Sequence, residues 1–300
     1  MEKIPLEKLH YKISRLHTPR IFIDSGTDLL IETEDAFTGQ ITKSHHRRNF
    51  ATMPFSNPLT GPIYINNAQP GDTLKIKILK ISPLTGQAAT KIDNLSKTME
   101  SALGETMTHG TRICKIKGKE IIWDDNVKLP YKPMIGSIGT APATEMPTSG
   151  EAGKHGGNMD IKEATEDSTL YLPVFVEGAL LHIGDVHARQ GDGELSGTGL
   201  EMAASIKIHI TLLKNNPIEC PRIENSQEIM AICTGLPMEI SAEKAYAELI
   251  LWMEKDYKIP RWAGYNLCTH VGTISVGFLK LGTIGAKIEK RFLKTPKFLS

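Results

Sequence analysis

The chain has few cysteines, the residues whose disulfide bonds stabilise small secreted proteins. It has 4 cysteines in 300 residues, and none of them belongs to a C-x-x-C pair. This argues against a disulfide framework and a thiolate zinc site, so we expect free thiols in a reducing compartment. No run reaches the roughly 18 uninterrupted apolar residues of a membrane span, and residues 1–7 lack the apolar segment of a signal peptide. We therefore expect a cytoplasmic protein without a membrane partner.

An excess of charge of either sign is also missing. The 35 Lys and Arg residues balance 34 Asp and Glu residues, for a formal net charge of +1. A general nucleic-acid binder would carry a surplus of basic residues, so we expect no nucleic-acid partner and interpret the basic stretch 43–48 as a solvated loop. The sequence has no Walker loop, no strand-linked G-x-G-x-x-G and no G-x-S-x-G elbow. Nothing in it favours a nucleotide cofactor or a serine nucleophile.

Short strands and turns fill the first two hundred residues. The clearest strand is 73–81, where Leu74, Ile76 and Ile78 alternate with lysines in the pattern of a half-buried strand. Residues 203–213 alternate in the same way. This density of strands predicts a mainly β protein built as a sandwich or a barrel. Further strands are expected at 20–24, 29–34, 61–65, 134–139 and 168–174, with a hairpin turn at 117–119.

One helix is expected in the C-terminal third. Ser241 is the predicted N-cap of a helix that runs to about residue 256 and carries Ala245, Leu249, Trp252 and Met253 on one face. The apolar stretch 262–280 leaves helix and strand open. We treat residues 1–300 as a single domain with a helical insertion at about 241–285.

The densest group of polar residues lies between glycines at 184–199. Asp185 and His187 are two residues apart and follow an apolar strand, so a continuing strand would project both from one face. Carboxylate and imidazole are ligands that a hydrolytic metal such as zinc accepts. Gly191 and Gly193 allow a tight backbone around Asp192 and Glu194. A solvated surface turn is the alternative, but it leaves the convergence of ionisable residues beside an apolar strand unexplained.

Two weaker groups could add to such a site. The segment 154–160 carries His155, Asn158 and Asp160 around a Gly-Gly pair, although alone it reads better as a capped turn. The carboxylates at 32–35, among them Asp35, follow a predicted strand. They could complete a metal site or simply mark an exposed strand end, and spacing does not decide between these interpretations.

Taken in order, these segments resemble the acetamidase/formamidase family. The resemblance rests on the runs 155–160, 168–174, 184–194 and 197–201, together with the early segments 34–41, 57–64 and 70–74. It implies a jelly-roll-like β-sandwich with a helical C-terminal addition, and a homo-oligomer. It also implies hydrolysis of the C–N bond of small linear amides, of the formamide or acetamide type, to carboxylate and ammonia. A bound divalent metal, usually zinc (Zn2+), is implied as well, with calcium (Ca2+) in some members.

The chemistry of amide hydrolysis suggests roles for individual residues. An amide is a poor electrophile and water a poor nucleophile, and a bound metal improves both. Asp160, Asp185 and His187 are the predicted ligands, with Asp35 and His155 as further candidates. The predicted catalytic residues are Glu194 as general base, Asp192, and Asn158 as a donor to the oxyanion. Gly156, Gly157 and Gln190 are predicted to bind substrate.

Other functions remain open at this point. The same carboxylate cluster could belong to a non-catalytic β-sandwich that binds a metal or a small ligand. A cyclic amide (lactam) could be the substrate instead of a linear one. Arg189 and His182 depart from the smaller residues expected in the family, which leaves the preferred amide undecided. Release of ammonia from formamide or acetamide separates the enzyme from the binding protein.

Overall fold

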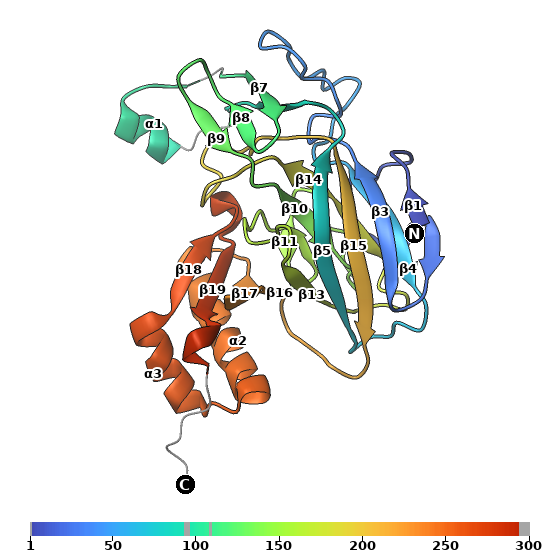
Figure 1. Ribbon diagram of the computed structural model, residues 1–300, viewed down its shortest axis with the longest axis vertical. Helices are drawn as coiled ribbons and strands as arrows, with labels where there is room; N and C mark the ends of the chain where they lie inside the picture. Colours follow the sequence, from blue (N-terminus) through green and yellow to red (C-terminus); the bar gives the residue numbers. More distant parts are fainter. Residues whose placement is uncertain (1, 93–96, 108–109, 294–300) are drawn as a thin grey trace.

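The largest element of the fold is a nine-stranded sheet that runs the length of the molecule (Figure 1). A computed structural model describes residues 2–92, 97–107 and 110–293. All neighbours in this sheet are antiparallel except the first two, which are parallel. In spatial order the strands are β1 (Glu2–Ile4), β3 (Thr27–Thr33), β15 (Ala204–Leu213), β5 (Thr73–Pro83), β13 (Thr169–Pro173), β16 (Arg222–Glu224), β17 (Glu228–Cys233), β19 (Ile284–Glu289) and β18 (Thr273–Val276).

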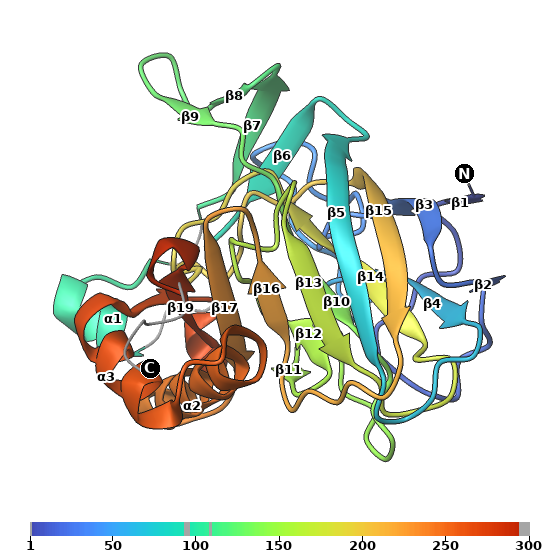
Figure 2. The same cartoon turned by 60° about the horizontal axis from the view of Figure 1, so that its bottom comes forward.

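A six-stranded sheet packs against the first and completes a β-sandwich (Figures 1 and 2). One continuous core joins them: Ile76 of β5 and Ile208 of β15 belong to the same buried cluster as Ile138 and Ile183 of the second sheet. The mainly β sandwich is therefore confirmed. In spatial order the second sheet contains β11 (Ala152–Gly153), β12 (Gly156–Asn158), β10 (Met134–Gly139), β14 (Leu181–His187), β4 (Leu59–Ile65) and β2 (Ile21–Ile23).

The alternation in β5 explains how the sandwich closes. Leu74, Ile76 and Ile78 are fully buried, whereas the lysines between them are partly exposed, as the period of two predicts. Beyond Ile78 the pattern shifts, and Ile81 is the next core residue. The pairing between β5 and β15 changes register at Lys207/Ile208. An extra residue in one strand of an antiparallel pair turns the following side chains to the other face.

A smaller sheet lies at one end of the sandwich. It is formed by two consecutive hairpins, and the predicted turn at 117–119 joins two of its strands. Its apolar residues are few: Ile121 and Cys114 are buried and join the main core. The sheet contains β6 (Gln87–Thr90), β7 (Arg112–Lys117), β8 (Glu120–Ile122) and β9 (Lys128–Pro130), and the short helix α1 (Lys97–Leu103) lies between β6 and β7.

The C-terminal third forms a small helical lobe with its own core (Figures 1 and 2). Helices α2 (Met238–Tyr257) and α3 (Arg261–Val271) pack against β17 and β19. The predicted apolar face is confirmed, because Ala245, Leu249, Trp252 and Met253 are all buried there. The helical insertion is shorter than expected: it ends at Val271, and the strands β18 and β19 follow, with the 3-10 turns η1 (Leu279–Leu281) and η2 (Lys290–Phe292).

The predicted N-cap of this helix is wrong. Helix α2 begins at Met238 after the N-cap residue Pro237, so Ser241 lies one turn inside it. The Ser241 hydroxyl donates instead to the carbonyl oxygen of Gly235, at 2.7 Å, and ties the helix to the loop before it. Pro fits the start of a helix because it has no N–H to leave unpaired. Among the described residues no helix is long and apolar enough to span a bilayer.

Candidate metal centre

Three adjacent strands of the second sheet bring the polar segments together. Strand β10 lies between β12 and β14, and its Ser137 pairs with Asn158 on one side and with Gly184 on the other. Asp185 and His187 lie on β14, and Asp160 follows the end of β12. The two glycine-flanked segments, distant in sequence, therefore meet across a single strand.

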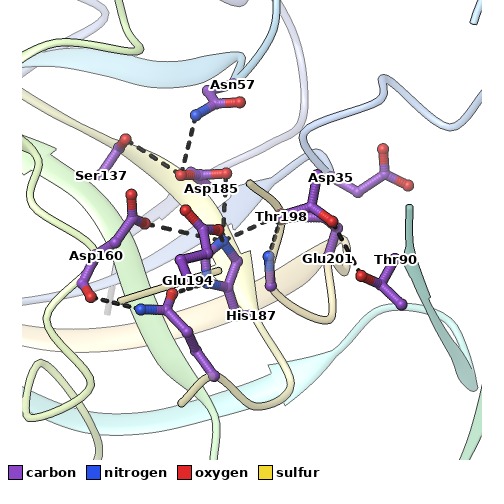
Figure 3. A network of polar contacts seen from close by, with 12 residues as sticks. Asp35, Asn57, Thr90, Ser137, Asp160, Asp185, His187, Glu194, Thr198 and Glu201 are labelled. Atoms are coloured by element: carbon purple, nitrogen blue, oxygen red, sulfur yellow. Dashed lines mark hydrogen bonds and ion pairs between the residues drawn. The ribbon is translucent and has the colours of Figure 1, made fainter. Parts of the chain in front are cut away.

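Four carboxylates surround one imidazole (Figure 3). The Nε2 atom of His187 lies 3.5 Å from Asp185 Oδ1 and 4.0 Å from Asp160 Oδ1. It also lies 3.9 Å from Glu194 Oε1 and 3.2 Å from Glu201 Oε2. These atoms form two overlapping donor groups that share His187: one with Asp160 and Asp185, the other with Glu194 and Glu201. We call these five residues the carboxylate–histidine cluster.

Two of the carboxylates are hydrogen-bonded through one oxygen and have the other oxygen unpartnered. Asn158 donates to Asp160 Oδ2 at 2.6 Å, and the backbone N–H of Gly199 donates to Glu201 Oε1 at 2.8 Å. The remaining oxygens, Asp160 Oδ1 and Glu201 Oε2, are buried and have no hydrogen-bond partner. Buried polar atoms normally have one. The unpartnered atoms therefore indicate a place for a cation.

His187 is held in the same manner. Its Nδ1 lies 2.8 Å from Gln190 Oε1, while the Gln190 amide nitrogen donates to the carbonyl oxygen of Asp160. Since Gln190 offers its oxygen to Nδ1, that nitrogen carries a proton, and Nε2 is the ring nitrogen that can bind a metal once it is deprotonated. The Nε2 atom is buried and without a hydrogen-bond partner. Metal-binding histidines are usually oriented by this kind of contact to the other ring nitrogen.

The electrostatics of the cluster also favour a cation. Burial and the neighbouring Asp185 raise the pKa of Asp160 well above its ordinary value, and burial and Asp160 do the same for Glu194. Burial raises the pKa of Glu201 to about 7. Burial lowers the pKa of His187, but the Glu201 and Asp185 carboxylates outweigh it and the pKa rises. Four buried carboxylates repel one another, and a divalent ion would neutralise them as protons do.

Two glycines give the ligands room. A Cβ atom at Gly136 would lie 2.5 Å from Asp160 Oδ1 and 2.7 Å from Asp185 Oδ2. A Cβ atom at Gly199 would lie 2.5 Å from the Nδ1 atom of His187. Both distances are far inside van der Waals contact, so any side chain at these positions would displace a ligand.

A cavity of about 230 Å³ opens onto the cluster. Asp185, Glu194 and Glu201 line it, whereas Asp160 is fully buried behind them. Its other walls include Phe37, Phe278 and Thr198 from loops outside the second sheet. A small molecule can therefore reach these carboxylates through this cavity.

Three predicted residues have other partners in the structure. Asp192 forms an ion pair with Lys162, and its side chain is 48% exposed, so it lies outside the carboxylate–histidine cluster. Gln190 contacts His187 and the Asp160 backbone, as a positioning residue would. The Asn158 amide donates to Asp160, and its oxygen accepts from Ser137 and Asn57, so these contacts position Asp160 and do not themselves indicate an oxyanion donor.

The remaining candidates lie beside the cluster or apart from it. His155 lines a separate cavity of about 560 Å³ with Glu151. It is therefore not among the residues that the structure brings together in the carboxylate–histidine cluster. The Asp35 carboxylate accepts the backbone N–H groups of Phe37 and Gly39, at 2.8 and 2.9 Å, and so closes its own turn. A Cβ atom at Gly156 or Gly157 would lie 2.3 Å from a backbone oxygen. Close strand packing, and not substrate binding, requires these glycines.

Sequence reasoning missed three contributors. Glu201 lies fourteen positions after His187, at the end of an irregular loop. An isolated antiparallel β-bridge pairs it with His187 and so places it in the cluster. Asn57 donates to Asp185 Oδ2 at 3.1 Å, and Ser137 donates to Asn158 at 2.6 Å. Glu201 stood in one of the family-like runs and could have been included. Asn57 likewise opens the family-like segment 57–64, whereas Ser137 carries no local signal, because only the pairing of distant strands brings it here.

A second group of polar residues contains the buried His182 of β14 and the partly exposed His10 and His17. The Nε2 atom of His182 lies 3.1 Å from the Nδ1 atom of His17, and the His17 ring stacks on the ring of His10. The Nδ1 atom of His182 contacts the Leu180 carbonyl oxygen. Burial and His17 lower the pKa of His182 to about 3. Burial, His17 and Arg20 lower the pKa of His10 to about 4. These rings are therefore neutral in the folded protein at ordinary pH.

We expect these histidines to make the fold sensitive to acid. The folded pKa values are depressed, so below about pH 6.5 the unfolded chain binds protons that the folded chain does not. The free energy of unfolding should fall as the pH drops from about 6.5 toward 4, by up to ~1.4 kcal/mol per pH unit for each such histidine. Urea unfolding of His182→Gln should show a shallower pH dependence than the native protein, and the exposed His45→Gln an unchanged one. Equal slopes for all three proteins would contradict this assignment.

Comparison with known proteins matches the chain to one family. A profile of the Acetamidase/Formamidase family matches residues 7–153 and 148–250. The crystal structure of an acetamidase from Yersinia enterocolitica is similar with a TM-score of 0.88 and 33% identity, covering 95% of this chain and 89% of that one. An acetamidase structure from Bacillus halodurans gives a TM-score of 0.89 and 29% identity, covering 97% and 98%.

The match to curated sequences is partial. The formamidase of Methylophilus methylotrophus is 26% identical over 249 residues, which cover 64% of this chain and 61% of that protein. The matched region thus spans about three fifths of that relative's length. The family profile nevertheless matches well over half of the chain, and the likeness in structure extends over nearly all of it. The chain therefore belongs to the acetamidase/formamidase family.

Proposed function

We propose that this protein hydrolyses the C–N bond of small linear amides, of the formamide or acetamide type, to a carboxylate and ammonia with the help of a divalent metal. Family membership supports the reaction class. One observation carries the proposal for the site: Asp160, His187 and Glu201 are each held through one atom by a neighbouring group, while another atom of each is buried without a hydrogen-bond partner in the carboxylate–histidine cluster.

The donor set favours zinc. Asp160 and Asp185 offer carboxylate oxygens and His187 an imidazole nitrogen, a combination typical of zinc in hydrolases. Calcium takes oxygen ligands almost alone, which makes His187 a poor ligand for it. Glu201, whose Oε2 atom lies 3.2 Å from His187 Nε2, would complete the set. When bound, the metal would polarise the amide carbonyl and lower the pKa of an attacking water toward ~7.

Glu194 is the residue best placed to handle protons. It belongs to the cluster, yet it lines the cavity from which substrate would approach. Burial and the neighbouring carboxylates raise its pKa, which suits a base that works near neutral pH. We propose that Glu194 accepts a proton from the attacking water and then donates it to the amide nitrogen. The products are one carboxylate and one ammonia for each water consumed.

The size of the cavity supports a small substrate. Its volume of about 230 Å³ lies below the ~300–1,000 Å³ of pockets for drug-sized ligands. Phe37 and Phe278 form part of the wall, so a short alkyl group would find apolar contacts while the amide faces the carboxylates. We infer that amides with one or two carbons are preferred over aromatic or long-chain amides.

Ammonia release measured with and without a chelator tests this function. We expect formamide or acetamide to yield ammonia, the chelated protein to lose at least ~90% of the rate, and added zinc to restore it. A thoroughly chelated protein that still releases ammonia at full speed would exclude the metal mechanism. Benzamide, which exceeds the inferred size limit, is the matched control substrate.

The same assay separates the alternatives. A protein that binds metal but releases no ammonia from any small amide would be a binding protein. Ring opening of a lactam yields an amino acid and no ammonia, so it would appear as substrate loss by chromatography without an ammonia signal. Either result would replace the proposal for linear amides.

A further inference from the structure

We propose that Cys220 and Cys233 form a reversible redox site, in which a peroxide converts the two thiols into a disulfide that links neighbouring strands. The two residues are thirteen positions apart in sequence and lie outside the carboxylate–histidine cluster. Both are free thiols in the structure. The proposal does not depend on the amidase function.

The strand register places the two cysteines opposite each other. Strands β16 and β17 are antiparallel, with Arg222 opposite Ala231, and the N–H of Ile232 donates to the carbonyl oxygen of Pro221 at 2.9 Å. Continuing this register by one more residue sets Cys220 opposite Cys233. Since the Pro221–Ile232 pair carries the hydrogen bond, the cysteines occupy a non-hydrogen-bonded position, where Cα atoms lie ~4.5 Å apart. Disulfides span Cα separations of ~4.4–6.8 Å.

The side chains meet as this register requires. The two thiols interact, and each shifts the pKa of the other. This interaction lowers the pKa of Cys233, aided by Lys244 and Lys154, although burial and Glu248 oppose it. The same interaction and burial raise the pKa of Cys220. Cys233 is therefore the thiolate that reacts first, and Cys220 is the thiol that resolves it.

Small oxidants can reach this pair. Both cysteines line a cavity of about 320 Å³ together with Lys154, Glu219, Lys244 and Glu248. Cys233 is partly exposed and Cys220 is buried. A reactive thiolate at the surface with a resolving thiol behind it is the arrangement typical of redox-sensitive cysteine pairs. Cys114 and Cys268 have raised pKa values because they are buried, and Cys268 reaches about 11.

The chemistry balances with hydrogen peroxide as the oxidant. The Cys233 thiolate attacks one peroxide oxygen, which forms a sulfenic acid and releases hydroxide. The Cys220 thiol then attacks the sulfenic sulfur, the S–S bond forms, and the sulfenic oxygen leaves as water. Two electrons pass from the two thiols to the peroxide, and the proton that Cys233 lost on ionising converts the released hydroxide into the second water. A small dithiol reverses the reaction by thiol–disulfide exchange.

Peptide mapping of the intact protein tests the site without any mutation. After brief treatment with peroxide, the free thiols should fall from 4 to 2 and the mass by about 2 Da. Non-reducing tryptic digestion should join the peptide 215–222 to the peptide 223–244, and dithiothreitol should separate them. Cys114 and Cys268 should remain reduced, with thiol loss at Cys233 at least ~10-fold faster than at Cys268.

Three variants complete the test. In Cys220→Ser, Cys233 should stop at the sulfenic acid and be trapped by dimedone, whereas Cys233→Ser should resist peroxide. Cys114→Ser, the matched control, should form the same cross-link as the native protein. The proposal is overturned if the native protein keeps four thiols, or if the cross-linked peptides contain other cysteines. Equal thiol loss in Cys233→Ser would overturn it as well.

Discussion

Replacing Glu194 by glutamine is expected to lower kcat for amide hydrolysis by ~10²–10⁴-fold while the metal stays bound. Glutamine keeps the shape of the side chain and one oxygen near His187, but it cannot accept a proton from water. The loss should therefore appear in kcat more than in KM, because substrate still enters the same cavity. Steady-state ammonia release and metal analysis of the same preparation provide both readouts.

Asp192→Asn is the matched control, since it changes a carboxylate two residues away in the same loop. Asp192 is half-exposed and paired with Lys162, so this variant should keep kcat within about twofold of the native value. If Glu194→Gln retained full activity while correctly folded, the proton would have to be handled elsewhere. Loss of metal from Glu194→Gln would instead identify Glu194 as a ligand.

Replacing His187 by alanine should have an even broader effect, removing metal and activity together. His187 belongs to both donor groups and supplies the nitrogen of the cluster, with Nε2 within 4.0 Å of four carboxylates. Without it, both donor groups lose their shared nitrogen ligand, so metal content should fall below about a tenth of the native value and kcat by at least ~10³-fold. Metal analysis after dialysis and circular dichroism, which checks the fold, are the measurements.

Gln190→Ala provides the graded comparison. It leaves every ligand in place but removes the oxygen that holds His187 Nδ1, and contacts of this kind alter metal affinity by ~10–100-fold. We expect Gln190→Ala to bind metal more weakly and to recover activity when excess zinc is added. His187→Ala should not recover. A His187→Ala protein with a full complement of metal would contradict the assignment of His187 as a ligand.

The sequence alone predicts those strands and helices whose burial follows a periodic pattern within one segment. Leu74, Ile76 and Ile78 predict their strand because burial alternates with a period of two, and Ala245 to Met253 predict a helix face. Asp185 and His187 could be paired because the spacing of two places them on one face of a strand. These inferences need only local geometry.

The rest of the site depends on contacts that no local pattern records. Asp192 and Glu194 are both carboxylates in the same loop. The backbone at Glu194, with φ +45°, directs that side chain toward the cluster, whereas Asp192 stays at the surface. Asn57 reaches Asp185 across 128 positions of sequence. His155 shares a segment with Asp160 but lines a different cavity. Each outcome follows from the pairing of strands, which a single sequence does not specify.

The two glycines behind the ligands have a consequence for how such an enzyme can change. Gly136 and Gly199 lie where any added carbon would strike Asp160 or His187, so neither position accepts a larger residue without displacing a member of the cluster. Phe37, Thr198 and Phe278 line the cavity from loops outside the second sheet. New substrate ranges in this scaffold would therefore arise by exchange of these loop side chains, while the residues behind the cluster stay unchanged.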